Sequence, residues 1–218
     1  MINLDLKNKI AECCYQEMIN NRICIVNKLK NPLTMNFPNF PIKSTQPVSQ
    51  AFLQISINDF QQACSHIKNL PYKKTSVKSN LLLVLEEKQG TCGSKHALLK
   101  KLAEENGFDA LQLKIGIYKM TPQNTPGIGN TIPAKIQFIP EAHAYLVFDN
   151  VRLDFTRANS RPLKDEDILQ EMSIDADEMS LRKEQLHKEF MAQWCQQNNL
   201  DFGEIWKIRE ACMEKLSA

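Results

Sequence analysis

The segment EAHAYLVFDNVRLDFT, residues 141–156, constrains the fold more than any other part of this sequence. It contains two short runs in which apolar and polar residues alternate, with Asp149 and Asn150 between them. Because aspartate and asparagine tolerate positive φ, this pair predicts a two-residue turn between antiparallel strands. If Phe148 faces Val151 across the turn, alternation gives the hairpin one apolar face and one polar face.

The polar face of this hairpin brings a histidine next to a carboxylate. In the predicted register His143 lies opposite Thr156 and Tyr145 lies opposite Asp154. His143 and Asp154 are then diagonal neighbours, with backbones roughly 7–8 Å apart. A carboxylate there can accept a hydrogen bond from one imidazole nitrogen, which fixes the tautomer and leaves the other nitrogen as a base. The alternatives are a histidine that is only packed or solvated, and an Asp154 that pairs with Arg152.

One of the seven cysteines has a setting that suits chemistry. In QGTCGSKH, Thr91 predicts the N-cap of a helix that runs from Cys92 to about Glu105. The first turn of a helix lowers the pKa of a thiol, because unpaired N–H groups and the positive end of the dipole stabilise the thiolate. The N–H groups of Cys92 and Gly93 have no partner within the helix and are free to donate to an oxyanion. The other six cysteines fall in predicted helices, where a small buried hydrophobe is the usual role.

His96 follows Cys92 by one helical turn and is a rival partner for it. It is a candidate base, a candidate metal ligand, or a surface or positioning residue. We favour the last interpretation, because no carboxylate in the sequence is placed to orient this imidazole. A metal site made of Cys92, His96 and His143 lacks the ligand spacing of zinc sites. We therefore predict no metal and no cofactor.

Charge and composition narrow the classes of function. The net charge is +2 and the basic residues are scattered, which predicts no nucleic-acid partner. The apolar run Leu81–Leu85 is far too short to cross a bilayer, and the N-terminus shows no secretory signal. An odd number of cysteines without any CxxC pair favours reduced thiols. We expect a cytoplasmic protein that contacts neither nucleic acid nor membrane.

The 218 residues predict a single domain in three parts. Residues 1–78 are expected to form N-terminal helices, one of them over residues 4–30, and an extended loop. Residues 79–157 form the core, and residues 158–218 form a charged, helical extension. Strands flanked by helices predict an α+β fold in which the Cys92 helix packs on an antiparallel sheet. The loop over residues 121–133 directly precedes the histidine strand, so we expect it to border a substrate groove, the alternative being an ordinary surface loop.

The stretch GTCGSKHALLKKLAEENGFDALQLKIG, followed by HAYLVFDNVRLDFT, resembles the core of the transglutaminase-like superfamily, which is related in architecture to papain-like cysteine peptidases. In that superfamily a cysteine opens a helix, a histidine lies on a following strand, and an aspartate lies on the next strand. The resemblance covers roughly residues 79–157. It implies that Cys92 is the nucleophile, His143 the general base and then acid, and Asp154 the group that orients the histidine. The papain motif itself is not matched, because Lys95 stands where those peptidases carry their nucleophile.

These residues predict a cysteine-dependent acyl-transfer enzyme that acts on a peptide or small amide through a thioester. With water as acceptor it is a peptidase, amidase or deamidase, and with an amine it is a transglutaminase or another acyltransferase. We favour hydrolysis, because water needs no second pocket. Two alternatives belong to other classes: a catalytically inactive transglutaminase-like binding module, and an interaction scaffold built on residues 163–218.

Overall fold

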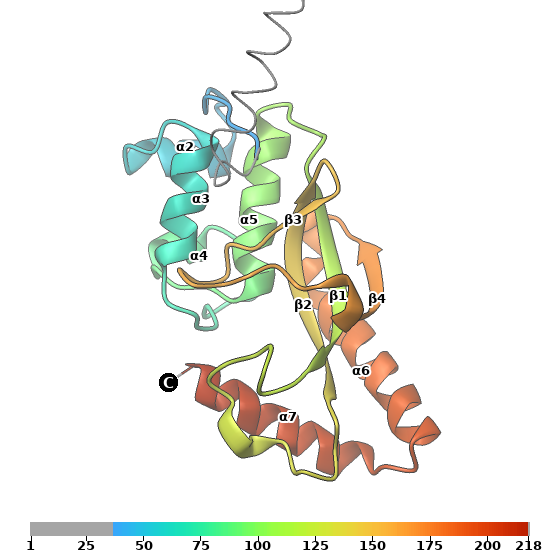
Figure 1. The fold of residues 1–218 in the computed structure, drawn as a ribbon. Coiled ribbons are helices and arrows are strands. Elements are labelled where there is room, and N and C mark those ends of the chain that lie inside the picture. Colours follow the sequence, from blue (N-terminus) through green and yellow to red (C-terminus); the bar gives the residue numbers. More distant parts are fainter. Residues whose placement is uncertain (1–36, 218) are drawn as a thin grey trace, which may run out of the picture. The chain divides into compact units, whose positions relative to one another are not determined.

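The structure is a computed structural model that describes residues 37–217 (Figure 1). The described chain from Pro38 onward belongs to one compact unit. The helix predicted over residues 4–30 lies outside the described residues. Helices and one antiparallel sheet make up the described part, so the predicted α+β class is confirmed.

A four-stranded sheet in the order β3-β2-β1-β4 forms the centre, and every neighbouring pair is antiparallel. Its strands are β1 (Gln112–Met120), β2 (Ile139–Phe148), β3 (Val151–Leu153) and β4 (Ile168–Ser173). β1 and β2 pair along their whole length, from Gln112↔Val147 to Met120↔Ile139. The predicted strand that follows the cysteine helix is β1. These two central strands therefore supply the rigid surface on which the site is built.

β2 and β3 form the predicted hairpin. Asp149 and Asn150 have φ values of 52° and 61°, as a two-residue turn of this kind requires. The register is the predicted one, with the pairs Phe148↔Val151, Val147↔Arg152 and Leu146↔Leu153. β3 ends at Leu153, however, so the further pairs that we expected for Asp154 and Thr156 are not part of the ladder. The edge of β2 around His143 is thereby left without a β3 partner, and the chain after Leu153 is free to turn toward it.

Helix α5 (Cys92–Glu105) has the predicted bounds. Its Thr91 N-cap forms a capping box with Ser94: the Ser94 N–H donates to the Thr91 hydroxyl, and the Thr91 N–H donates to Ser94 Oγ at 2.9 Å. Gly107 follows the helix with a φ of 71°, which suits the predicted C′ position. α5 packs against β2, and Cys92 at its start interacts with His143 and the Ala144 backbone in the middle of that strand.

Between residue 37 and α5 the chain forms three helices: α2 (Pro47–Gln54), α3 (Phe60–Asn69) and α4 (Leu83–Glu86). Each of them contacts α5. α3 begins at an Asp59 N-cap whose carboxylate accepts a hydrogen bond from the Gln62 N–H at 2.8 Å. This group of helices braces the side of α5 that is turned away from the sheet.

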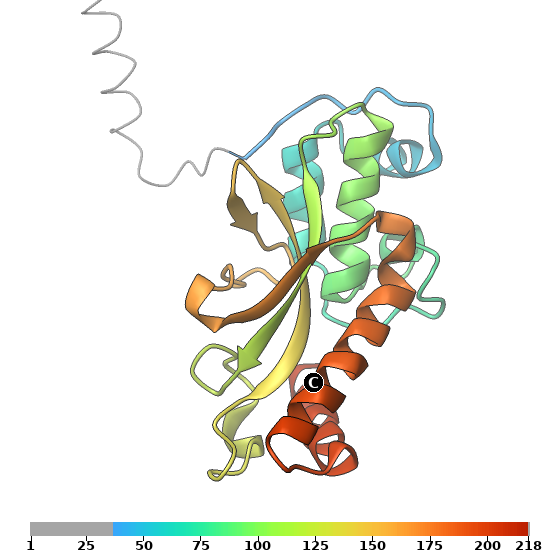
Figure 2. The same ribbon diagram turned by 90° about the vertical axis from the view of Figure 1, so that its right-hand side faces the viewer.

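The expected helical extension needs a correction, because residues 168–173 form the edge strand β4 and pair with β1. The helices of this part are α6 (Met179–Gln197) and α7 (Phe202–Ser217). Figure 2 shows α6 on the same side of the sheet as α5, and α6 contacts both α5 and β2. The extension therefore completes the sheet and also reaches the beginning of α5.

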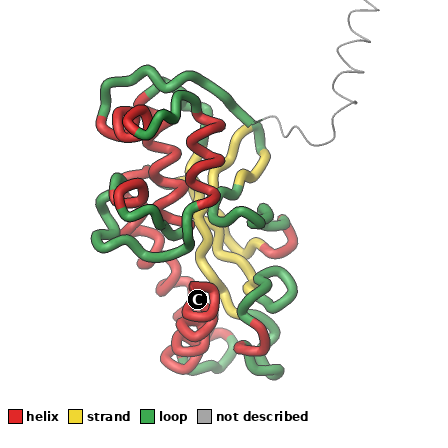
Figure 3. The backbone as a smooth tube through the Cα atoms, turned by 90° about the vertical axis from the view of Figure 1, so that its left-hand side faces the viewer, coloured by secondary structure: helices red, strands yellow, loops and turns green. Residues whose placement is uncertain are grey.

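The loop over residues 121–133 does not border the cavity described below. It lies beside α7 at the far end of β1 and β2 (Figure 1), among the loops near the C-terminal helix in Figure 3. Its Ile128 is fully buried there, in a cluster with Tyr118, Met191 and Cys212. The loop is not a wall of the cavity, and apart from Ile128 and Ile132 its residues are exposed or half-buried, so the surface alternative describes it better. Among residues 37–217 no helix is long and apolar enough to cross a membrane.

Candidate active site

The three residues singled out from the sequence lie together. Cys92 is the first residue of α5, His143 stands in the middle of β2, and Asp154 directly follows β3. His143 Nε2 lies 2.9 Å from Asp154 Oδ2. The other side of the His143 ring interacts with the Cys92 thiol, and each of these two groups shifts the pKa of the other. Cys92 is only 2% exposed and Asp154 only 8%.

Asp154 is held in place by the end of β3. Its Oδ1 accepts a hydrogen bond from the Thr156 N–H at 2.9 Å, so both carboxylate oxygens have donors. Burial alone raises the pKa of Asp154, but His143 and these hydrogen bonds outweigh it and hold the pKa well below its usual value. Arg152, the competing partner that we considered, binds Glu171 and Asp165 instead. The carboxylate is therefore ionised and committed to His143.

The charge on the Cys92 thiol is set by two basic side chains. Burial raises its pKa. Lys183, His143 and a hydrogen bond from the Ala144 backbone lower it by more than burial raises it, so the net pKa lies well below that of an ordinary thiol. Lys183 Nζ approaches the sulfur to 3.2 Å from α6. Burial lowers the pKa of His143, while Asp154 and Cys92 raise it more strongly. These opposite shifts favour a thiolate beside an imidazolium.

The first turn of α5 also presents two backbone donors. The capping box uses the N–H groups of Thr91 and Ser94. The N–H groups of Cys92 and Gly93 make no hydrogen bond within residues 37–217. Gly93 also lines the cavity described below. A negatively charged oxygen next to the sulfur therefore has two donors within the same helical turn.

His96 is a positioning residue, and the surface alternative is wrong because its side chain is fully buried. Its Nε2 accepts a hydrogen bond from the Phe155 N–H at 2.8 Å, so the proton lies on Nδ1, which donates to the Cys92 carbonyl at 2.8 Å. Burial lowers the pKa of His96 to about 4. Both nitrogens are engaged, so this ring has none left for a metal. It ties the start of α5 to the chain that carries Asp154.

Lys95 has a second structural role at this junction. Its side chain is fully buried, and its ammonium group donates to the carbonyls of Leu70 and Thr156. Burial lowers the pKa of Lys95 to about 8. A Cβ on Gly90 would lie 2.9 Å from Lys95 Cγ, so the room left by this glycine is taken by the lysine. Lys95 and His96 together fix the segment after β3 against α5.

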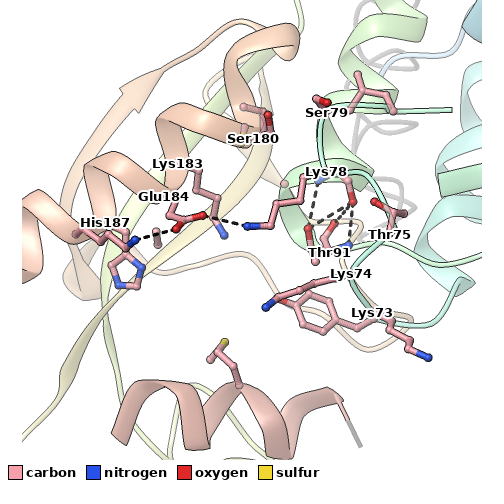
Figure 4. Close-up of a pocket in the computed structure, with 18 of the residues that line it drawn as sticks. Lys73, Lys74, Thr75, Lys78, Ser79, Thr91, Ser180, Lys183, Glu184 and His187 are labelled. Carbon is pink, nitrogen blue, oxygen red and sulfur yellow. Dashed lines mark hydrogen bonds and ion pairs between the residues drawn. The ribbon is translucent and has the colours of Figure 1, made fainter. Parts of the chain in front are cut away.

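A cavity of about 380 Å³ opens at the first turn of α5 (Figure 4), and Cys92, His143 and Asp154 lie behind its wall and not among the residues that line it. Its walls come from residues 72–81, the first turn of α5, α6 and α7. Three of the lining residues adjoin the site. Gly93 follows Cys92 in the chain and Ala142 precedes His143, whereas Lys183 contacts the Cys92 sulfur. This position gives a small molecule or the end of a peptide a place to bind next to the sulfur.

Lys183 is the residue of this site that the sequence did not reveal. It lies in SLRKEQLHKEF, where lysines and glutamates alternate with few apolar residues, as on many solvent-exposed helices. Its contact with Cys92 depends on how α6 packs against α5. No spacing within α6 distinguishes Lys183 from the neighbouring lysine, Lys188.

No protein-family model matches the chain, and neither does any curated protein or solved structure. The resemblance to the transglutaminase-like superfamily stays a prediction from the residues that carry it.

Proposed function

We propose that this chain is a cysteine-dependent acyl-transfer enzyme that acts on amides through a thioester intermediate, built on a transglutaminase-like core. The observation that carries the proposal is the contact of Cys92 with His143 and of His143 with Asp154, at the start of a helix with two unpaired backbone N–H groups. The order along the chain of helix, histidine strand and aspartate supports the proposed core. Cys92 is the nucleophile, His143 the acid and base, and Asp154 the residue that orients His143.

In the first half of the reaction the Cys92 thiolate attacks the amide carbonyl carbon and forms a carbon–sulfur bond. The carbonyl electrons move onto oxygen, where the N–H groups of Cys92 and Gly93 stabilise the negative charge. The tetrahedral intermediate then collapses, the carbon–nitrogen bond breaks, and the His143 imidazolium gives its proton to the leaving amine. Cys92 is left as a thioester and His143 as a neutral base.

In the second half His143 takes a proton from water, and the resulting hydroxide attacks the thioester. Breaking the carbon–sulfur bond releases a carboxylic acid and restores the thiolate–imidazolium pair. An amine in place of water gives a new amide and makes the enzyme a transferase. Water is the proposed acceptor because the cavity beside the thiol already has to hold the acyl substrate.

Site-resolved alkylation with iodoacetamide tests this proposal. At pH 6, Cys92 should react on the order of a hundredfold faster than free cysteine, which is almost entirely protonated there. His143→Ala should remove most of this advantage. His66→Ala changes a histidine on α3, away from the site, and serves as the matched control.

The competing interpretation, an inactive binding module, predicts a different result. Cys92 would then react no faster than free cysteine, and His143→Ala would leave its rate unchanged. A folded protein with that behaviour would rule out the enzyme. The far-ultraviolet circular dichroism of each variant separates loss of reactivity from loss of fold.

A further inference from the structure

The cavity beside Cys92 has an excess of positive charge. Its basic residues outnumber its acidic ones. The basic residues are Lys73, Lys74, Lys78, Lys183, Lys188 and Arg209, and the acidic residues are Asp177, Glu184 and Glu210. The walls also carry apolar side chains, among them Leu81, Met179 and Trp206. A cavity of this composition can hold a molecule that is partly apolar and partly anionic.

The acidic residues are all occupied by ion pairs. Glu184 binds both Lys78 and Lys188, at 3.1 and 2.9 Å. Asp177 binds Lys101, which lies outside the cavity wall, at 2.7 Å. Glu210 binds Arg209, which also binds the buried Glu141. No acidic side chain of the wall is left to balance the remaining cations.

Three lysines of the cavity form no ion pair with any carboxylate of residues 37–217: Lys73, Lys74 and Lys183. Lys183 is the one that touches the Cys92 sulfur. Figure 4 shows Lys74 and Lys183 extending from opposite walls toward the space between them, while Lys73 points away. Because Lys183 is already partnered by the Cys92 sulfur, Lys74 is the unpaired cation that faces this recess, and an unpaired cation at a recess attracts anions into it.

We propose that the amide substrate carries an anionic group, a carboxylate or a phosphate, which binds in this cavity near Lys74 and Lys183 while the amide carbonyl reaches Cys92. This inference rests on the acyl-transfer function proposed above and adds the class of its substrate. The anion pairs with Lys74, which has no carboxylate partner within residues 37–217, on the side of the cavity that faces Lys183, and the apolar wall around Trp206 contacts the rest of the molecule.

Two alkylating reagents that differ only in charge test the inference. Iodoacetate and iodoacetamide attack the same sulfur, but only iodoacetate carries a carboxylate. The ratio of their rates at Cys92, divided by the same ratio for free cysteine, should be at least about ten at low ionic strength and should fall as salt is added. Lys74→Gln should lower this normalised ratio severalfold, whereas Lys164→Gln, an exposed position outside the cavity, should not change it.

The two proposals fail in different ways. If Cys92 reacts rapidly with both reagents but the normalised ratio is near one and Lys74→Gln does not alter it, the anionic substrate is wrong and the enzyme stands. If Cys92 is slow with both reagents, the acyl-transfer function is wrong and the substrate class falls with it.

A protection experiment identifies the anion. Succinate or inorganic phosphate, whichever resembles the anionic group of the substrate, should protect Cys92 from iodoacetamide. Protection by neither at tens of millimolar would overturn the inference.

Discussion

Two buried carboxylates lie close to the β2–β3 hairpin, and they have different partners. Glu141 is bound by the Arg209 guanidinium through two contacts of 2.7 and 2.8 Å, whereas Asp154 is bound by the His143 imidazole at 2.9 Å. An arginine keeps its proton at any pH that the fold survives, but a histidine can release it. Both pairs are buried and hydrogen-bonded, and the ability of the cation to lose a proton separates a structural pair from one that is suited to catalysis.

The largest expected effect comes from breaking the arginine pair. Burial raises the pKa of Glu141, but His187 and Arg209 together lower it to about 2, so the carboxylate is charged inside the protein. Arg209→Met leaves that charge without its main partner, and the free energy of unfolding should fall by about 3–5 kcal/mol. Urea unfolding at pH 7 measures this difference.

Two further variants show whether the loss comes from the unpaired charge. Arg182→Met changes an exposed arginine on α6 and should alter the free energy of unfolding by less than about 0.5 kcal/mol. Adding Glu141→Gln to Arg209→Met should restore part of the stability. A double variant that is no more stable than Arg209→Met would show that lost packing, and not the uncompensated carboxylate, is the cause.

The next largest effect concerns the histidine pair and appears in reactivity more than in stability. In Asp154→Asn the side-chain carbonyl can still accept from the Thr156 N–H, which turns the amide NH₂ toward His143. The His143 imidazole must then accept at Nε2 and carry its proton on Nδ1. It also loses the negative charge of Asp154, which stabilised the protonated imidazolium. Alkylation of Cys92 at pH 6 should fall by roughly ten- to a hundredfold.

Asp109→Asn, an exposed position beyond α5, is the control for this change and should alkylate as the unmodified protein does. If Asp154→Asn lowered the free energy of unfolding as much as Arg209→Met while leaving the alkylation rate unchanged, the distinction between the two pairs would be wrong.

The smallest of these effects is expected from Lys183→Gln. Lys183 lowers the pKa of the Cys92 thiol, so the thiolate persists as the pH falls below the range of ordinary thiols. Without this ammonium group the inflection in the alkylation rate should move up by about one pH unit, a tenfold loss at pH values below the inflection. A profile from pH 4 to 9 measures the shift, with Lys207→Gln on α7 as control. An unmoved inflection would assign the low pKa to His143 alone.

The parts of the fold that could be predicted from the sequence depend on local signals. Two adjacent residues that tolerate positive φ are enough to indicate the hairpin turn, and the capping box at the start of α5 lies within four residues. Register then followed from the turn, because a two-residue turn at Asp149 and Asn150 pairs Phe148 with Val151. These signals were enough to propose Cys92, His143 and Asp154 together.

The features that could not be predicted from the sequence all depend on contacts between distant segments. The segment ILQEMS carries no clear alternation, and β4 forms because β1 offers an unpaired edge about fifty residues earlier. Lys95 and His96 are charged or polar residue types that usually face solvent, and their burial follows from the segment after β3 that covers them. The cavity has the same origin, since its walls come from five separate parts of the chain.

The contact of Lys183 with Cys92 has a consequence for the order in which the protein becomes reactive. The two residues are 91 positions apart, and the lysine arrives only when α6 docks beside α5. A chain in which α5 and the hairpin have formed but α6 has not docked holds a thiol without this cation. The full nucleophilicity of Cys92 therefore depends on the docking of α6, so a change that loosens this helix from α5 would lower the reactivity of the thiol without touching the Cys92–His143–Asp154 contacts.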